Sequence, residues 1–195
     1  MKPKPLLLIA LATTIMHCSE IRETEVAEPL RIENADLGIA IAALPEPFSV
    51  VEASGPILEL TAAGDVGSGT VIITAGPEEA FGINLVAAVK ERKAIFESAP
   101  DGHYFGNREL GTPHGTAFTA RGAYTGESGP VEETWVYSIH PGSNRLLTIT
   151  YTYPPGESEV RVNQLLLLLG EIEGLAEGEG GTEGKDFENQ SGGDT

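Results

Sequence analysis

The sequence predicts an α+β domain whose main element is an antiparallel sheet. Three observations indicate this class. Short apolar segments alternate with turns that contain glycine and proline, two longer segments carry apolar residues at helical spacing, and four strand-like segments follow one another with only short turns between them. The 195-residue chain, of which 41% is hydrophobic, is long enough to bury a core as a single domain. We therefore expect a sheet with a four-strand meander, one mid-chain helix and a C-terminal helix packed on the sheet.

The first strands are short and end at turn residues. Apolar segments separated by proline and glycine predict strands at 39–44, 48–52, 57–61 and 70–74. The glycine-rich segment 64–69 between the last two has the composition of a phosphate-binding loop. Such a loop is followed by a helix, whereas a strand is expected here, so we interpret it as a hairpin turn.

A helix is predicted after these strands. Pro77 and the two acidic residues that follow it are typical of a first helical turn, where proline needs no hydrogen-bond donor and carboxylates favour the positive end of the helix dipole. The segment 98–100, which ends in proline, is expected to stop the helix. Its apolar face comprises Phe81, Leu85, Val89 and Phe96.

A meander of four strands follows the helix. These strands are predicted at 103–110, 116–124, 131–139 and 145–153. Residues alternate in character along the last two strands, which is typical of a sheet with one buried face. The face expected in the core comprises Trp135, Tyr137, Ile139, Leu147, Ile149, Tyr151 and Tyr153. The opposite face, interpreted as a possible binding face for an extended partner, comprises Thr134, Ser138, Thr148, Thr150 and Thr152.

The last predicted element is a helix at 158–175 that covers the sheet. It follows a turn at 154–156, and its leucines recur at helical spacing. The apolar face comprises Leu165, Leu168, Leu169, Ile172 and Leu175. Residues 177–195 consist mainly of glycine, acidic and small polar residues, so this tail is predicted to be disordered.

The N-terminal segment has the pattern of an export signal. Lys2 and Lys4 precede the apolar run 6–15, which is shorter than the roughly 20 residues needed to span a bilayer. Cys18, the one cysteine of the chain, comes soon after this run. The residues 15–18 resemble the motif of bacterial lipoproteins, in which a small apolar stretch precedes a cysteine that is lipidated, although His17 departs from the small residue that the family prefers.

This pattern predicts four segments: a lipoprotein signal peptide (1–17), a flexible tether (18–36), a single α+β domain (37–176) and the acidic tail (177–195). Lipid on Cys18 would anchor the protein to a bacterial cell membrane, facing the periplasm or the exterior. A secreted protein without lipid and an uncleaved N-terminal anchor remain alternative interpretations.

The charge of the chain restricts its partners. The formal net charge is −17, which disfavours binding to nucleic acid and to bare anionic lipid because like charges would have to approach one another. We therefore expect no nucleic-acid partner. A protein or another component of the cell envelope is the expected partner.

No catalytic, metal or cofactor motif is found in the sequence. His103, His114 and His140 lack the spacing of metal ligands, and no nucleophile motif is present. We expect neither a metal nor a cofactor. A hydrolase that uses His103, His140 or carboxylates in an unrecognised site remains the alternative hypothesis.

The order of the predicted elements resembles that of a known superfamily. Strands, a helix, a four-strand meander and a covering helix, with an opening strand that runs into the segment 44–48 (Leu-Pro-Glu-Pro-Phe), resemble the superfamily of the PsbP extrinsic proteins of photosystem II and a Ran-binding nuclear import factor. The resemblance covers 37–175 and lies in topology, so no functional residue carries over. Members mostly act as binding or assembly subunits, which implies a membrane-tethered binding or assembly module.

Overall fold

The computed structural model describes residues 29–79 and 82–175, and in this part of the chain the fold is α+β with antiparallel strand pairing throughout. A seven-stranded sheet has the order β3-β4-β5-β9-β8-β7-β6, and a three-stranded sheet has the order β1-β2-β10. The elements are β1 (Ile32–Asn34), β2 (Ile39–Ile41), β3 (Phe48–Glu52), β4 (Ile57–Ala62), β5 (Gly69–Glu78), α1 (Leu85–Ser98), β6 (His103–Thr112), β7 (Gly115–Gly126), β8 (Gly129–Ile139), β9 (Arg145–Tyr153), α2 (Ser158–Gly170) and β10 (Ile172–Gly174). The predicted fold class and the four-strand meander are confirmed.

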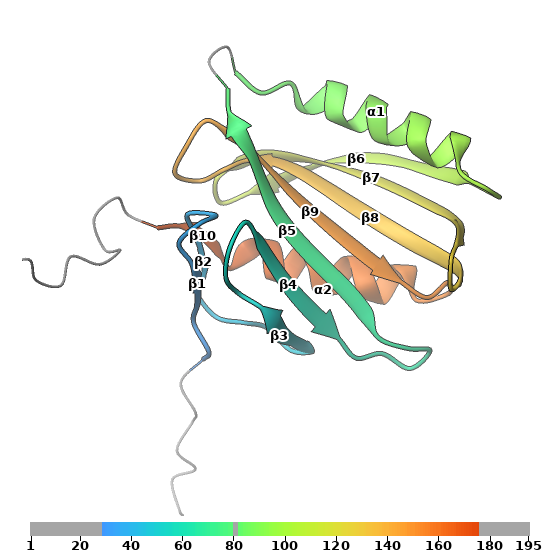
Figure 1. The fold of residues 1–195 in the computed structure, drawn as a ribbon, viewed down its shortest axis with the longest axis horizontal. Coiled ribbons are helices and arrows are strands. Elements are labelled where there is room, and N and C mark those ends of the chain that lie inside the picture. The colour runs from blue at the N-terminus through green and yellow to red at the C-terminus, as the bar shows by residue number, and fades with distance from the viewer. Residues whose placement is uncertain (1–28, 80–81, 176–195) are drawn as a thin grey trace, which may run out of the picture.

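The two helices lie on opposite faces of the large sheet (Figure 1). On the face of α2, side chains of β4, β5 and β9 pack with the helix and with the small sheet to form the main core, which includes Leu60, Ile73, Ile149, Leu165 and Leu168. On the other face α1 packs over β6, β7 and β8 around a smaller core. The sheet is therefore buried on both sides, although each helix covers only part of its face.

The predicted start of the first helix is wrong. Pro77 lies in β5, close to an irregularity in the pairing of β5 with β9. A proline is tolerated at such a position because no ladder hydrogen bond from its nitrogen is required. The helix begins at Leu85, and the side chain of Asn84 caps it by accepting a hydrogen bond from the main-chain N–H of Ala87 at 3.0 Å. Of the predicted apolar face, Leu85, Val89 and Phe96 are buried, and Phe81 lies outside the described residues.

The predicted division of β8 and β9 between two faces is also wrong. Paired residues of neighbouring strands share a face, and Trp135 pairs with Thr150 while Tyr137 pairs with Thr148. Thr134 pairs with the buried Tyr151 on the face of α2. Residues alternate between the two faces within each strand, as predicted. The register between β8 and β9, however, places the aromatic residues of β8 on the same face as the threonines of β9.

The five residues of the predicted binding face therefore do not share one face. Thr148, Thr150 and Thr152 lie on the side of α1, whereas Thr134 and Ser138 lie on the side of α2 and are buried. A sheet with two covered faces gives buried positions on both sides of a strand, so polarity alone does not fix which residues point to which helix.

The ends of the domain differ from the prediction because of the small sheet. α2 ends at Gly170, and Ile172 is buried in β10, which pairs with β2. The helix expected at 158–175 is therefore too long. β1 pairs with β2 from the other side and buries Ile32, so the folded part begins inside the expected tether 18–36. Among residues 29–79 and 82–175, no helix is long and apolar enough to cross a membrane.

Candidate functional site

A groove lies between α2 and the strands β6, β7 and β8, and it is the strongest candidate for a binding site. α2 packs on β9, so the outer strands of the meander are left partly uncovered on this face. The resulting cavity has a volume of about 220 Å³. Its apolar lining comprises Leu110, Val136, Val162, Leu165, Leu166 and Leu169. Leu166 remains 38% exposed, so the chain itself leaves apolar surface open to a ligand.

Arginine and threonine side chains form the polar part of this groove. Arg121 on β7 donates from Nη2 to the hydroxyl of Ser158, the first residue of α2. Its Nε is buried and has no hydrogen-bond partner within residues 29–79 and 82–175. Thr134 shares a hydrogen bond of 2.9 Å with the hydroxyl of Tyr153. A buried guanidinium N–H without a partner is costly, so this atom marks a place where an acceptor would stabilise the site.

The mouth of the groove is formed by β6, an edge strand. A bulge between Tyr104 and Gly106 interrupts its pairing with β7, and Phe105 in the bulge is 53% exposed. Arg108 follows on the same strand and also lines the groove. Its main chain is fixed by Thr119, whose hydroxyl accepts from the Arg108 N–H at 3.1 Å and donates to its carbonyl at 3.3 Å. The edge strand is thus held firmly while the side chains of Arg108 and Leu110 line the groove.

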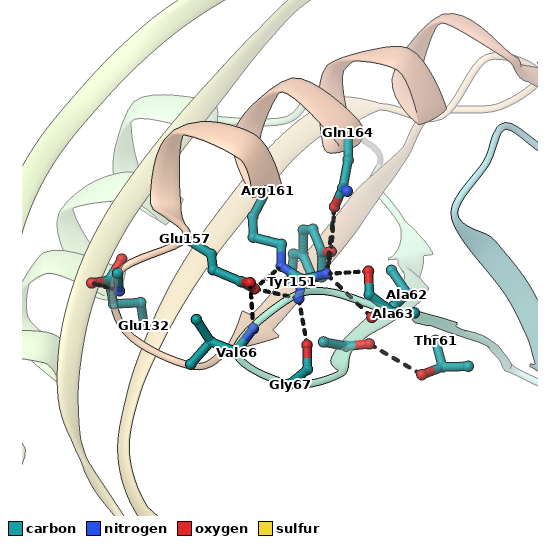
Figure 2. Close-up of polar contacts among 12 residues, drawn as sticks. Thr61, Ala62, Ala63, Val66, Gly67, Glu132, Tyr151, Glu157, Arg161 and Gln164 are labelled. Atoms are coloured by element: carbon teal, nitrogen blue, oxygen red, sulfur yellow. Dashed lines mark hydrogen bonds and ion pairs between the residues drawn. The ribbon is translucent and has the colours of Figure 1, made fainter.

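Arg161 fixes the first turns of α2 to the large sheet (Figure 2). Its side chain is fully buried, and its Nη1 donates to the carbonyl of Ala62 at 3.2 Å and to the hydroxyl of Tyr151 at 2.9 Å. Nη2 donates to the carbonyl of Gly67 at 2.6 Å and forms an ion pair with Glu157. Because the same helix forms one wall of the groove, this cluster positions that wall.

The same cluster explains the glycine-rich loop. β4 and β5 form a hairpin, as predicted, and the loop between them receives the guanidinium of Arg161. A Cβ at Gly64 would lie 1.8 Å from Nη2 of Arg161, so a larger residue there would displace this guanidinium from its hydrogen bonds. The carboxylate of Glu157 accepts from the N–H of Val66 at 2.8 Å, and this hydrogen bond together with Arg161 lowers the pKa of Glu157. The loop binds an internal cation, the guanidinium of Arg161.

A second polar cluster lies beneath α1. Glu133, only 8% exposed, accepts hydrogen bonds from the hydroxyl of Tyr124 and from Nε1 of Trp135, both at 2.7 Å. The guanidinium of Arg92 lies 3.2 Å from the centre of the Trp135 ring. Burial, and then the hydrogen bond to Glu133, raise the pKa of Tyr124 to about 12. Arg92 therefore attaches α1 to the sheet.

The histidines of the hydrolase hypothesis do not converge. His140 is buried, and its Nε2 contacts the carbonyl of Leu37 at 2.8 Å while its Nδ1 accepts from the N–H of Gly142 at 3.0 Å. Burial lowers the pKa of His140. His114 contacts the carbonyl of Ile172 at 2.7 Å, and His103 lies exposed at the start of β6. Within the described ranges, no group of three or more histidine, cysteine or acidic residues could hold a metal ion.

The structure brings few of the predicted site residues together. Thr134 lines the groove, Ser138 lies beside a smaller cavity near β10, and the threonines of β9 lie on the other face. Cys18 lies outside the described residues. Sequence reasoning missed Arg121 and Arg161, although an arginine within an otherwise small or apolar segment is a signal for a buried cation.

The comparisons with known proteins define the fold. The chain matches no protein-family model and no curated protein. It is structurally similar to LpqN of Mycobacterium tuberculosis, with 10% identity, a TM-score of 0.51, and coverage of 78% of this chain and 88% of that chain. It is also similar to the Ran-binding protein Mog1p of Saccharomyces cerevisiae, with 13% identity, a TM-score of 0.50, and coverage of 75% and 95%. These similarities support the predicted PsbP-like and Mog1-like fold.

Proposed function

We propose that this protein is an exported binding module, tethered to a cell membrane by lipid on Cys18. We further propose that it binds a cell-envelope component in the groove between α2 and the strands β6, β7 and β8. The observation that carries the proposal is the groove itself. Its walls are mostly apolar, its edge strand is unpaired on the outer side, and a buried N–H of Arg121 lacks an acceptor.

The similar proteins favour binding over catalysis as the role. LpqN is involved in cell envelope biogenesis, and Mog1p is a Ran-binding protein. The hydrolase alternative gains no support, because His140 and His114 are engaged with main-chain carbonyls and His103 stands apart from them. A binding module at the envelope is the function that the groove and these similarities support best.

The membrane tether is part of the proposal and rests on the sequence. The short apolar run 6–15 and Cys18 supply an export signal and a thiol for lipid. Two or more acyl chains are needed for stable anchoring, as in the bacterial lipoproteins that this segment resembles. The domain would then lie outside the bilayer, with the groove facing the periplasm or the exterior.

The tether is tested by labelling cells with a fatty acid and fractionating wild type and Cys18→Ala in parallel. We expect wild type to carry the label and to remain with membranes, and the variant to lose both properties. Absence of label together with a soluble wild-type protein would refute the tether and leave the secreted form.

The groove is tested by photo-crosslinking in intact cells. A photoreactive residue at position 166 lies in the groove, whereas one at the neighbouring position 167, which is 61% exposed and does not line the groove, serves as the matched control. We expect an adduct with an envelope component from position 166 only. Identical adducts from both positions, or none from either, would contradict the assignment.

A further inference from the structure

We propose that the ligand of the groove is an anionic amphiphile, with its apolar chain along the leucines of α2 and its carboxylate or phosphate group on Arg121. This inference deepens the proposed function and depends on it, because it names the chemical class of what the groove holds. It rests on three features of the groove: the apolar wall, the unsatisfied cation and the place of that cation at the end of a helix.

The apolar wall suits a flexible chain better than a flat ring. The cavity of about 220 Å³ is smaller than the roughly 300–1,000 Å³ of ordinary small-molecule sites, and it extends beside the helix past Val162, Leu166 and Leu169. A linear chain could fill this volume along the helix, from Arg121 toward Leu169. Each methylene that enters the groove should strengthen binding by about fourfold.

Arg121, the cation that lines the groove beside the first residue of α2, forms no ion pair among the described residues. Among residues 29–79 and 82–175, neither Arg121 nor Arg108 forms an ion pair. Glu132 lies on the same face of the sheet as Arg121. One of its oxygens accepts from the N–H of Gly156 at 3.3 Å, the other is buried without a hydrogen-bond partner among the described residues, and no ion pair joins Glu132 to Arg121. The buried Nε of Arg121 therefore still needs an acceptor, and an acidic group would supply one with a charge-assisted hydrogen bond.

The end of α2 adds to the positive potential at this point. Arg121 contacts Ser158, which is the first residue of the helix, so the guanidinium lies beside the positive end of the helix dipole. The helix end itself carries Glu157 at its N-cap, paired with Arg161, and Glu159 in its first turn, so the guanidinium of Arg121 is the main feature that favours an anion over a cation here. This arrangement lies on a chain with a net charge of −17, where most of the surface would repel the same acidic group.

The test is a binding titration with defined amphiphiles below their micelle concentrations. The full chain carrying Cys18→Ala, which has no lipid of its own, is titrated with dodecanoate, dodecyl phosphate, dodecyl maltoside and dodecyltrimethylammonium. We expect the two anionic probes to bind at least about tenfold more tightly than the neutral and cationic ones. Equal binding of the maltoside, or tighter binding of the cation, would overturn the inference.

Two further probes separate the head group from the chain. Inorganic phosphate alone should compete weakly, and decanoate should bind more weakly than dodecanoate by the factor expected for two methylenes. If phosphate alone competes as well as dodecyl phosphate, the site is an anion site and the amphiphile is excluded. If chain length matters but charge does not, Arg121 has no part in recognition.

Variants locate the binding in the groove. Arg121→Gln should reduce the preference for anionic probes by about tenfold, Arg121→Lys should restore part of it, and Lys90→Gln on α1 should leave it unchanged. Leu166→Trp should fill the groove and abolish binding, while Leu167→Trp should not. If Arg121→Gln does not fold, Arg108→Gln on the exposed edge strand tests the same charge effect, and unchanged anion preference in that variant would count against the inference.

The outcomes distinguish this inference from the proposed function. Loss of the crosslink at position 166, together with no binding of any probe, would refute both. A crosslink from position 166 without binding of the anionic probes would leave the groove as a binding site and exclude the anionic amphiphile.

Discussion

Replacement of Arg161 by methionine tests whether the polar cluster at the start of α2 holds this helix on the sheet. In the native structure the guanidinium donates to the carbonyls of Ala62 and Gly67 and to the hydroxyl of Tyr151, and its side chain is fully buried. Methionine has a similar length but no donor. The carbonyls of Ala62, Ala63 and Gly67 and the carboxylate of Glu157 would lose this partner, and of these residues Ala62 is fully buried.

The expected loss follows from these contacts. An unsatisfied buried acceptor costs about 1–3 kcal/mol, which applies in full to the carbonyl of Ala62. The part-buried carbonyls of Ala63 and Gly67 and the carboxylate of Glu157 add a smaller amount, and the packing of the methionine side chain offsets part of the total. We expect the free energy of unfolding to fall by about 3 kcal/mol, which is a large fraction of the roughly 5–15 kcal/mol available to a domain. The glycine-rich loop should detach first, because Arg161 is its partner within the core.

Urea unfolding followed by the fluorescence of Trp135, the single tryptophan, measures this loss. Asn163→Met on the exposed side of the same helix is the matched control and should change stability by no more than about 0.5 kcal/mol. Equal midpoints for the two variants would refute the reasoning. So would a more stable Arg161→Met, since buried ion pairs can be replaced by apolar side chains at no cost when their hydrogen bonds contribute little.

Three further predictions concern titration and close packing. Burial lowers the pKa of His140 below its ordinary value of 6.5, so the free energy of unfolding should fall as the pH drops below 6.5. Urea unfolding at a series of pH values measures this dependence, and His140→Gln should flatten it. Burial and a carboxylate partner raise the pKa of Tyr124 to about 12, so the free energy of unfolding should fall between about pH 10 and 12. An absorbance titration should show a tyrosine ionisation near pH 12 that is absent in Tyr124→Phe. Gly64→Ala should destabilise the fold because the added Cβ would lie 1.8 Å from Arg161, whereas Gly111→Ala, with no atom within 4 Å, should be tolerated; thermal unfolding compares the two.

The sequence predicted those elements whose boundaries carry local chemical signals. Turns with glycine and proline gave the strands of the meander, and β9 agrees with its prediction at both ends. Helix α1 was misplaced because Pro77 is compatible with a helix start and with an irregular strand, and only pairing with β9 decides between them. Local signals therefore predicted the positions of most elements but not the elements against which each one packs.

The candidate site depends on contacts that local patterns do not encode. The register of β8 with β9, which places Thr134 beside Tyr151, reverses the expected faces. The separate register of β7 with β8 aligns Arg121 with Thr134. α2 then leaves a groove over the outer strands because it packs on β9. The sequence shows that a strand position is polar. It does not show which of the two helices covers that position.

The central claim is that the ligand binds in the groove between α2 and the meander. Methyl NMR of the full chain during titration with dodecanoate tests it most directly, because Val136 and Leu165 line the groove while Val89 lies in the separate core beneath α1. We predict that the methyl signals of Val136 and Leu165 shift in a saturable manner and that those of Val89 do not. Unchanged groove signals, or shifts centred on Val89, would contradict the account.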